Sequence, residues 1–356
     1  MSIHQTFEKL VARYRSGAWK AQDNILTAEV TAPLPGDIAT LPPDDTSDRR
    51  ELERLGQEAL RRGELGLVIL AGGMATRFAW DKPKGLFPIY QATSFLGWKI
   101  TWAREICGER LPIHIMTSFH THEAIREHLE EHDFFGHDPA SVHLFQQYRF
   151  RRLTPDGTFF DSPGGQENDA APGHGDFADA LRTSGLLGRF LSGGGRVILF
   201  SNVDNLGATP DLAIVGYHLQ TGAEMTAEVA AKAKGDKGGA PARVGGRLQL
   251  VEGFAFPPGF DQDSVPVFNT ATYCFDARAL DREFDLPWYV VEKSVEGQSV
   301  IQFEHLAGDL SCTLATRFLA VDRDDRFIPV KSQADVPEAQ ARIARKAERL
   351  SSVLSF

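Results

Sequence analysis

Short apolar runs alternate with helical patterns through the middle of the chain. Residues 65–70, Leu-Gly-Leu-Val-Ile-Leu, are fully apolar and lead into Ala-Gly-Gly, which is typical of a buried parallel strand that ends in a glycine turn. Further strands are predicted at residues 113–117, 142–145 and 196–201, and helices at residues 95–107, 121–131 and 181–190. Strands that alternate with helices favour an α/β fold with a mostly parallel central sheet flanked by helices.

The pattern changes in the second half of the chain. Three shorter runs of alternating character, at residues 226–230, 247–252 and 267–275, predict an antiparallel or mixed extension of the sheet. Ala, Arg, Lys and Glu at helical spacing then predict a C-terminal helix over residues 336–356.

The first 64 residues precede the sheet and look helical. Phe7, Leu10, Val11 and Tyr14 recur at helical spacing, and a proline-rich loop follows. A second helix is expected to begin at a cap formed by Ser47 or Asp48 and to end near residue 63. We therefore divide the chain into an N-terminal helical extension (1–64), a main unit (65–335) and the C-terminal helix.

Composition and charge restrict the function classes. With 42% hydrophobic residues among 356, the chain can bury a sizeable core. Its net charge of −10 argues against a nucleic acid as partner, since such proteins usually carry a basic face. No apolar stretch reaches 18 residues and no secretory signal is present, so no membrane partner is expected. Three scattered cysteines form no disulfide framework, which favours the cytoplasm.

The residues after the first strand carry the strongest chemical signal. Leu-Ala-Gly-Gly-Met-Ala-Thr-Arg-Phe (70–78) is followed by Lys-Pro-Lys-Gly at 82–85. Paired glycines let the backbone approach a flat ring or a phosphate because no Cβ intervenes. Arg77 can grip phosphate oxygens with its forked guanidinium, and Lys84 can act as a point charge. The spacing is neither that of a Walker loop nor GxGxxG.

These segments resemble the LxGGxGTR…PKG signature of the UDP-sugar pyrophosphorylases, which join UTP to a sugar 1-phosphate. Further segments agree in the family's order, and those at 171–176 and 201–208 resemble the uridylyltransferases that act on glucose 1-phosphate. They are Phe-Gln-Gln (145–147), Ala-Pro-Gly-His-Gly-Asp (171–176), Ser-Asn-Val-Asp-Asn-Leu-Gly-Ala (201–208) and Arg-Phe-Ile-Pro-Val-Lys (326–331), with weaker matches at 237–239, 268–270 and 302–304. The resemblance covers about residues 65–335 and implies a glycosyltransferase-A-like nucleotidyltransferase fold. Residues 65–220 would form its nucleotide-binding part and residues 221–335 its sugar-binding part.

The resemblance also assigns roles to individual residues. Uracil needs a planar hydrogen-bonding edge, which an amide provides; Gln147 is expected there, or Gln146 if the register is shifted by one. The nucleotide-binding set is then Ala71, Gly72, Gly73, Gln147, Gly173, His174 and Asn202. The sugar-binding set is Gly239, Glu252 and Asn269.

The reacting phosphates need cations. Lys84 and Lys331 would hold the α-phosphate and the sugar phosphate, and Arg77 would steady the departing pyrophosphate. Mg²⁺ prefers one or two carboxylates together with phosphate oxygens, so Asp204, at the end of an apolar strand, is the expected metal ligand. A second protein ligand is not evident from the sequence.

The expected reaction is attack of glucose 1-phosphate on the α-phosphorus of UTP, with pyrophosphate as the leaving group. A UDP-N-acetylglucosamine pyrophosphorylase is the alternative within the class, because the loop AGGMATRF leans toward that enzyme. A non-catalytic nucleotide-sugar sensor is the alternative from another class, and the intact set Arg77, Lys84, Asp204 and Lys331 argues against it. The oligomeric state stays open, with a monomer as one option.

Two further features of the sequence bear on the site, a substituted glycine and a pair of histidines. Ala75 replaces a glycine of the family pattern, and we expect it to have negative φ, because a left-handed alanine costs about 1 kcal/mol.

His128 and His132 stand at i, i+4, where they could share a helix face and bind zinc. No third ligand and no HExxH glutamate accompanies them in the sequence, so zinc is not expected.

Overall fold

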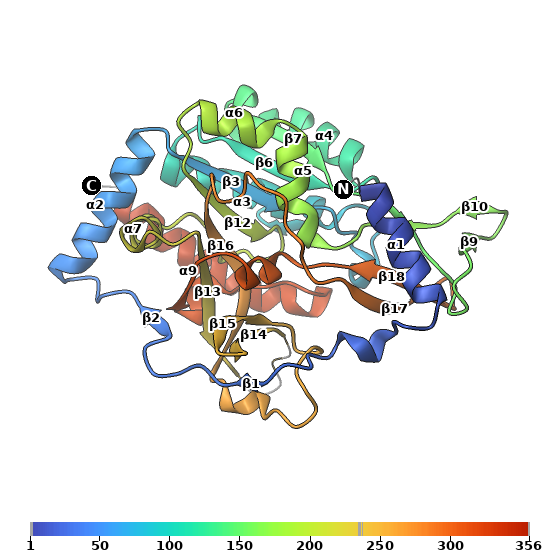
Figure 1. Cartoon of the computed structure of the whole chain (residues 1–356). Helices are drawn as coiled ribbons and strands as arrows, with labels where there is room; N and C mark the ends of the chain where they lie inside the picture. Colours follow the sequence, from blue (N-terminus) through green and yellow to red (C-terminus); the bar gives the residue numbers. More distant parts are fainter. Residues whose placement is uncertain (1–2, 234–235, 237, 355–356) are drawn as a thin grey trace.

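An eight-stranded mixed sheet runs through the centre of the molecule (Figure 1). The computed structural model describes residues 3–233, 236 and 238–354. The strands lie in the order β2 (Ile38–Thr40), β19 (Thr316–Val321), β13 (Met225–Ala231), β16 (Val267–Asp276), β12 (Val197–Asn202), β3 (Leu65–Leu70), β6 (Ile113–Thr117) and β7 (Val142–Gln146). Only β16 runs antiparallel to its neighbours in this sheet, so the prediction of a mixed, mostly parallel sheet is confirmed.

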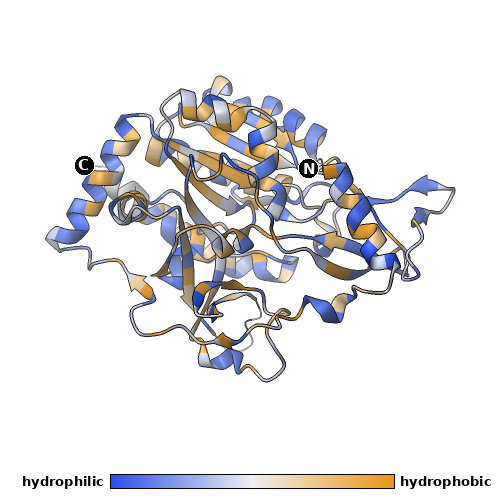
Figure 2. Ribbon diagram, in the orientation of Figure 1, coloured by the Kyte–Doolittle hydropathy of each residue, from blue (hydrophilic) through white to orange (hydrophobic). Residues whose placement is uncertain are grey.

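Strand β3 is buried on both faces, which explains its unbroken apolar sequence. Val68 and Leu70 belong to one hydrophobic cluster, with Phe200 of β12 and Phe177. Leu67 and Ile69, together with the other alternate positions, belong to the cluster on the opposite face. Figure 2 shows the apolar strands inside and the polar helix faces outside.

Helices cover the two faces of this sheet (Figure 1). They are α3 (Phe95–Cys107), α4 (His122–Glu131), α5 (Phe177–Thr183), α6 (Leu186–Ser192), α7 (Leu212–Thr221), α8 (Arg323–Arg326) and α9 (Val336–Leu354). The helix predicted over residues 181–190 is wrong, because the chain turns at Gly185, whose φ of +79° favours glycine and ends one helix before the next begins.

Residues 3–64 contact several parts of the molecule. Helix α1 (Ile3–Arg15) packs on the hairpin of β17 (Tyr289–Val295) and β18 (Gln298–Glu304) through a cluster that includes Phe303. Strand β1 (Val30–Thr31) pairs with β14 (Ala240–Val244), which also pairs with β15 (Arg247–Val251). The division of the chain into three functional units stays a prediction.

Helix α2 (Ser47–Arg61) lies directly against α7 (Figure 1). Glycines permit the close approach, because a Cβ on Gly56 or Gly216 would overlap a backbone carbonyl of the other helix. The cap of α2 is Thr46, which accepts from the N–H of Arg49, so the predicted caps Ser47 and Asp48 are wrong by one or two residues.

The remaining strands form two-stranded ribbons outside the central sheet. They are β4 (Pro88–Tyr90) with β5 (Thr93–Ser94), β8 (Phe150–Arg151) with β11 (Asp169–Ala170), and β9 (Asp161–Ser162) with β10 (Gln166–Glu167). None of the helices in the described part of the chain is long and apolar enough to cross a bilayer.

Candidate active site

The predicted residues of the glycine loop, together with Lys84, Asn202 and Asp204, lie where β3 and β12 end side by side. These parallel strands are paired up to Leu70 and Asn202, and the N–H of Val203 then donates to the carbonyl of Leu70 at 3.0 Å. The chain leaves β3 toward β6 on one side and returns as β12 on the other. Open α/β sheets bind ligands at the carboxyl ends of strands at such a switch point.

The glycine loop after β3 is tied to the segment that carries Lys84. The N–H of Lys84 donates to the carbonyl of Gly73 at 3.0 Å, and the N–H of Ala75 donates to that of Lys82 at 3.2 Å. Ala75 has a φ of −88°, so the expectation of negative φ is confirmed. The left-handed residue of this loop is instead Ala79, with φ +50°.

The Gln147 side chain lies between the two glycine segments. Its amide nitrogen donates to the carbonyl of Gly173 at 3.1 Å, and its amide oxygen occupies the space that a Cβ on Gly72 would need. A Cβ on Gly72 would therefore displace the Gln147 amide, whereas a Cβ on Gly73 would meet no atom within 4 Å. Gln146, the alternative register, is exposed at the end of β7. The geometry thus favours Gln147 as the amide that faces the loop.

The loop that carries Gly173 and His174 rests on residues 305–308, a segment the sequence did not single out. Gly173 has a φ of +86°, and a Cβ on it would lie 2.5 Å from the carbonyl oxygen of His305. The N–H of Ala307 donates to Nδ1 of His174 at 3.0 Å. Burial lowers the pKa of His174 to about 4, although the charge of Glu304 opposes this, so the ring is neutral at pH 7.

Lys84 and Asp204 form an ion pair across the site. The ammonium Nζ lies 2.5 Å from Oδ2 of Asp204, and the Lys84 side chain is buried against the rings of Phe78 and Phe95. The Asp204 side chain keeps 28% of its surface exposed. One cation and one carboxylate thus meet beside the glycine loop.

The other two predicted cations are exposed. The Arg77 guanidinium is exposed and makes no ion pair within the described ranges. The Lys331 side chain is also exposed. Lys331 follows Val330, whose N–H donates to the carbonyl of Asp204 at 3.1 Å, so the structure brings these two site residues together. Asn202 ends β12, one residue before the turn to Asp204.

The predicted sugar-binding residues form a second group. The N–H of Asn269 donates to the carbonyl of Gly239 at 2.8 Å, and a Cβ on Gly239 would lie 3.1 Å from a carboxylate oxygen of Glu252. Burial raises the pKa of Glu252. Gly308 borders the amide of Asn269, so residues 305–308 contact both groups. Lys237, part of a weaker sequence match, lies outside the described residues.

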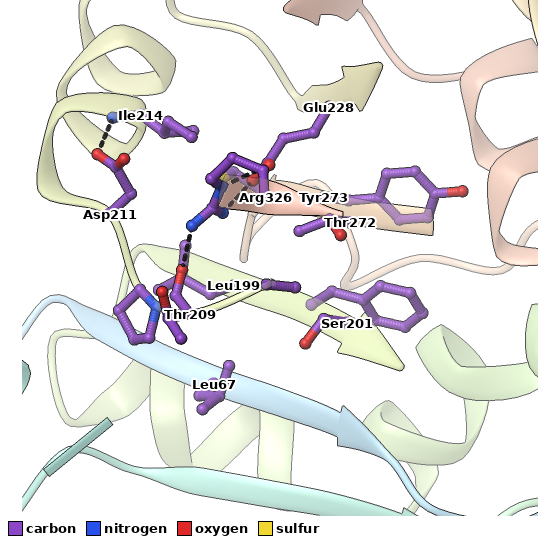
Figure 3. A pocket seen from close by; sticks show the side chains of 14 residues that line it. Leu67, Leu199, Ser201, Thr209, Asp211, Ile214, Glu228, Thr272, Tyr273 and Arg326 are labelled. Atoms are coloured by element: carbon purple, nitrogen blue, oxygen red, sulfur yellow. Dashed lines mark hydrogen bonds and ion pairs between the residues drawn. The ribbon is translucent and has the colours of Figure 1, made fainter. Parts of the chain in front are cut away.

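A buried ion pair holds the two loops that carry Asp204 and Lys331. Figure 3 shows Arg326 against Glu228, with bonds of 2.6 and 2.9 Å, and its third bond reaches the carbonyl of Thr209 at 2.7 Å. The side chain of Asn205 completes the link, because its Oδ1 accepts from the N–H of Ile328 at 2.9 Å. Arg326 was visible in the 326–331 motif, but nothing in the sequence marked Glu228 as its partner.

Lys99 of α3 stabilises the turn at residues 201–208 through hydrogen bonds. Its ammonium donates to Oγ of Ser201 at 2.7 Å and to the carbonyl oxygens of Asn205 and Ala208. Burial lowers the pKa of Lys99 to about 7, and the charge of Arg326 adds to the effect. A lysine within the apolar first two turns of α3 was the signal that sequence reasoning missed.

Comparison with known proteins identifies the family of the chain. A family model described as UTP–glucose-1-phosphate uridylyltransferase matches residues 5–350. The chain belongs to this family. Family membership makes it a nucleotidyltransferase, as the motifs predicted, and the ordered segments from 70 to 331 all fall inside the match.

Curated relatives include members with two different names. The UTP–glucose-1-phosphate uridylyltransferase of Musa acuminata is 28% identical over 355 residues, covering 93% of this chain and 72% of the relative. The UDP-N-acetylglucosamine diphosphorylase 2 of Arabidopsis thaliana is 28% identical over 348 residues, covering 85% of this chain and 68% of the relative.

Solved structures share the fold. The UDP-glucose phosphorylase of Trypanosoma brucei superposes with a TM-score of 0.76 at 23% identity, covering 94% of this chain and 74% of that one. The UDP-N-acetylglucosamine pyrophosphorylase described as putative from Entamoeba histolytica gives 0.76 at 20% identity, covering 88% and 87%. The predicted nucleotidyltransferase fold is thereby confirmed.

Proposed function

We propose that the chain is a uridylyltransferase that makes UDP-glucose and pyrophosphate from UTP and glucose 1-phosphate. The observation that carries this is the Gln147 amide, held between two glycine segments beside the Lys84–Asp204 pair. An amide edge bordered by bare backbone suits a flat base, and a neighbouring cation suits its phosphates.

The base-binding part supplies shape and hydrogen bonds. Gln147 reads the uracil edge, and the backbone of Ala71, Gly72, Gly73 and Gly173 closes around the ring. Since Gly73 has open space where a Cβ would stand, the ring can approach it closely. His174 is neutral, so it acts as a hydrogen-bonding group and not as a cation, and Asn202 completes the set.

The phosphate-binding part supplies positive charge. Lys84 lies at the junction of the two strands and holds the α-phosphate, while Lys331 approaches from the neighbouring segment to hold the sugar phosphate. Arg77, which is exposed, binds the departing pyrophosphate with its forked guanidinium. The reaction needs little covalent catalysis by the protein. Positioning of the substrates and compensation of their charge would therefore account for most of the rate enhancement.

The residues present also fit Mg²⁺. Asp204 offers a partly exposed carboxylate whose charge already faces a cation, and Mg²⁺ takes one or two carboxylates with substrate phosphate oxygens. Asp204 would hold it, and when bound there it would offset the negative charge of the phosphates. The ammonium of Lys84 also pairs with this carboxylate, so Lys84 and the metal would lie close together at the phosphates.

The sugar contacts come from the second group. Asn269 and the carboxylate of Glu252 would bind sugar hydroxyls beside the Gly239 backbone, and the contacts that join these three residues support the assignment. The three thiols are free and scattered, which suits a reducing compartment, and we place the protein in the cytoplasm.

A substrate panel tests the proposal. The protein is incubated with UTP, Mg²⁺ and separate sugar 1-phosphates, and pyrophosphate release is measured. Release with glucose 1-phosphate is the expected result. Release restricted to N-acetylglucosamine 1-phosphate would reassign the sugar, and no release with any sugar would refute the enzyme reading.

A further inference from the structure

The end of α4 carries three possible metal ligands that the proposed reaction does not use. His128, Glu131 and His132 follow the spacing H-x-x-E-H, in which positions i, i+3 and i+4 lie on one helix face. One ligand atom of each lies within 4.8 Å of the ligand atoms of the other two. We propose that these side chains form a binding site for Zn²⁺. Glu131 is the third ligand that sequence reasoning did not recognise.

Both imidazoles have one nitrogen committed to an oxygen and the other available. Nδ1 of His132 lies 2.9 Å from the carbonyl oxygen of His128, which fixes the proton on Nδ1 and leaves the lone pair on Nε2. Nε2 of His128 lies 2.8 Å from Oγ of Ser94, and in the tautomer that donates to this hydroxyl the Nδ1 lone pair is free for a metal. A second hydrogen bond of this kind orients metal-binding histidines.

The surroundings hold the two rings together. Their centroids are 4.2 Å apart, and the ring of His132 stacks on Phe135 at 5.2 Å and 20°. Ser94 is itself fixed, because its Oγ accepts from the N–H of Gly97 as the cap of α3. Arg126 on the same helix is bound by Glu123 and Glu130, so its charge is compensated, and Lys82 is the cation whose charge acts on His128.

The ligand chemistry selects the metal. Two imidazoles and one carboxylate suit Zn²⁺, which four-coordinate sites bind through nitrogen and oxygen with water in the last position. Mg²⁺ prefers oxygen ligands alone and does not compete for this site. The zinc site is inferred from the three side chains and not from the proposed function. A result that refutes one of these two proposals therefore does not refute the other.

Calorimetric titration of the full chain with ZnCl₂, in excess Mg²⁺ to fill the Asp204 site, is the test. We expect one Zn²⁺ per chain, with binding about tenfold weaker or lost in His132→Ala and in Glu131→Gln. Matched controls are His4→Ala, which removes an exposed histidine 3.3 Å from Glu8, and Glu127→Gln on α4 itself. Both controls should bind Zn²⁺ like the original chain.

Cobalt provides an independent readout. Co²⁺ in place of Zn²⁺ should give a visible absorption band that His132→Ala lacks and His4→Ala keeps. Because Glu131 and His132 are exposed, their variants should fold, and unchanged unfolding temperatures without metal verify this. The proposal is overturned if Zn²⁺ does not bind the original chain, if His132→Ala binds it equally well, or if Asp204→Asn abolishes the binding.

Discussion

The buried pair of Arg326 and Glu228 allows a quantitative test of what holds the active-site loops. Arg326 is 6% exposed and Glu228 2% exposed, and they share two hydrogen bonds. Arg326→Met leaves the carboxylate buried without a counter-charge and the Thr209 carbonyl without this donor. Breaking a buried pair on one side costs about 3–5 kcal/mol. At about 2 °C per kcal/mol for a chain of this size, Tm should fall by roughly 6–10 °C.

The assay is thermal unfolding followed by circular dichroism, with two comparison variants. Arg54→Met removes exposed ion pairs with Glu51 and Glu58 and should change Tm little, because solvent screens such pairs. Arg326→Met combined with Glu228→Met leaves no unpaired charge and should recover much of the lost stability. If Arg326→Met melts within about 2 °C of Arg54→Met, the reasoning about the buried pair is refuted.

Three further outcomes are expected. Lys84→Ala should lower kcat about 100- to 1000-fold while calorimetry still detects UTP binding; an unchanged kcat would remove Lys84 from the mechanism. Gly72→Ala should raise the KM for UTP about tenfold or more, because its Cβ displaces the Gln147 amide, whereas Gly188→Ala, with open space at its Cβ, should not. Burial lowers the pKa of His114 to about 3, so below pH 6.5 the unfolded chain binds the proton and stability falls. Urea titrations from pH 7 to 5 measure how the free energy of unfolding falls with pH. For His114→Leu this fall should be smaller than for the original chain, by up to about 1.4 kcal/mol per pH unit; equal slopes would contradict this.

The sequence predicted those parts of the molecule in which one local pattern decides the structure. Strand β3 was placed correctly because burial on both faces requires an unbroken apolar run. Helix α3 was bounded correctly because its pattern is long. The expectation that Gln147 lies near Gly72 and Gly173 came from the order of the motifs and not from periodicity, because these residues are far apart in the chain.

Other features depend on pairings that no local pattern reveals. Strand β2 has only three residues and joins the sheet through β19, almost 280 positions later. Glu228 lies in an apolar strand, and its partner Arg326 is 98 residues away, so the sequence shows a buried charge without showing what balances it. The break at Gly185 was missed because the hydrophobic pattern continues across it.

Residues 305–308 have a consequence for the order of events at the site. One end of this segment supports the His174 loop, which we propose binds the base, and the other end borders Asn269, which we propose binds the sugar. A displacement that improves the fit of one substrate therefore moves a wall of the other's pocket. Coupling of this kind is reciprocal: if bound UTP changes the affinity for the sugar phosphate by some factor, bound sugar phosphate changes the affinity for UTP by the same factor.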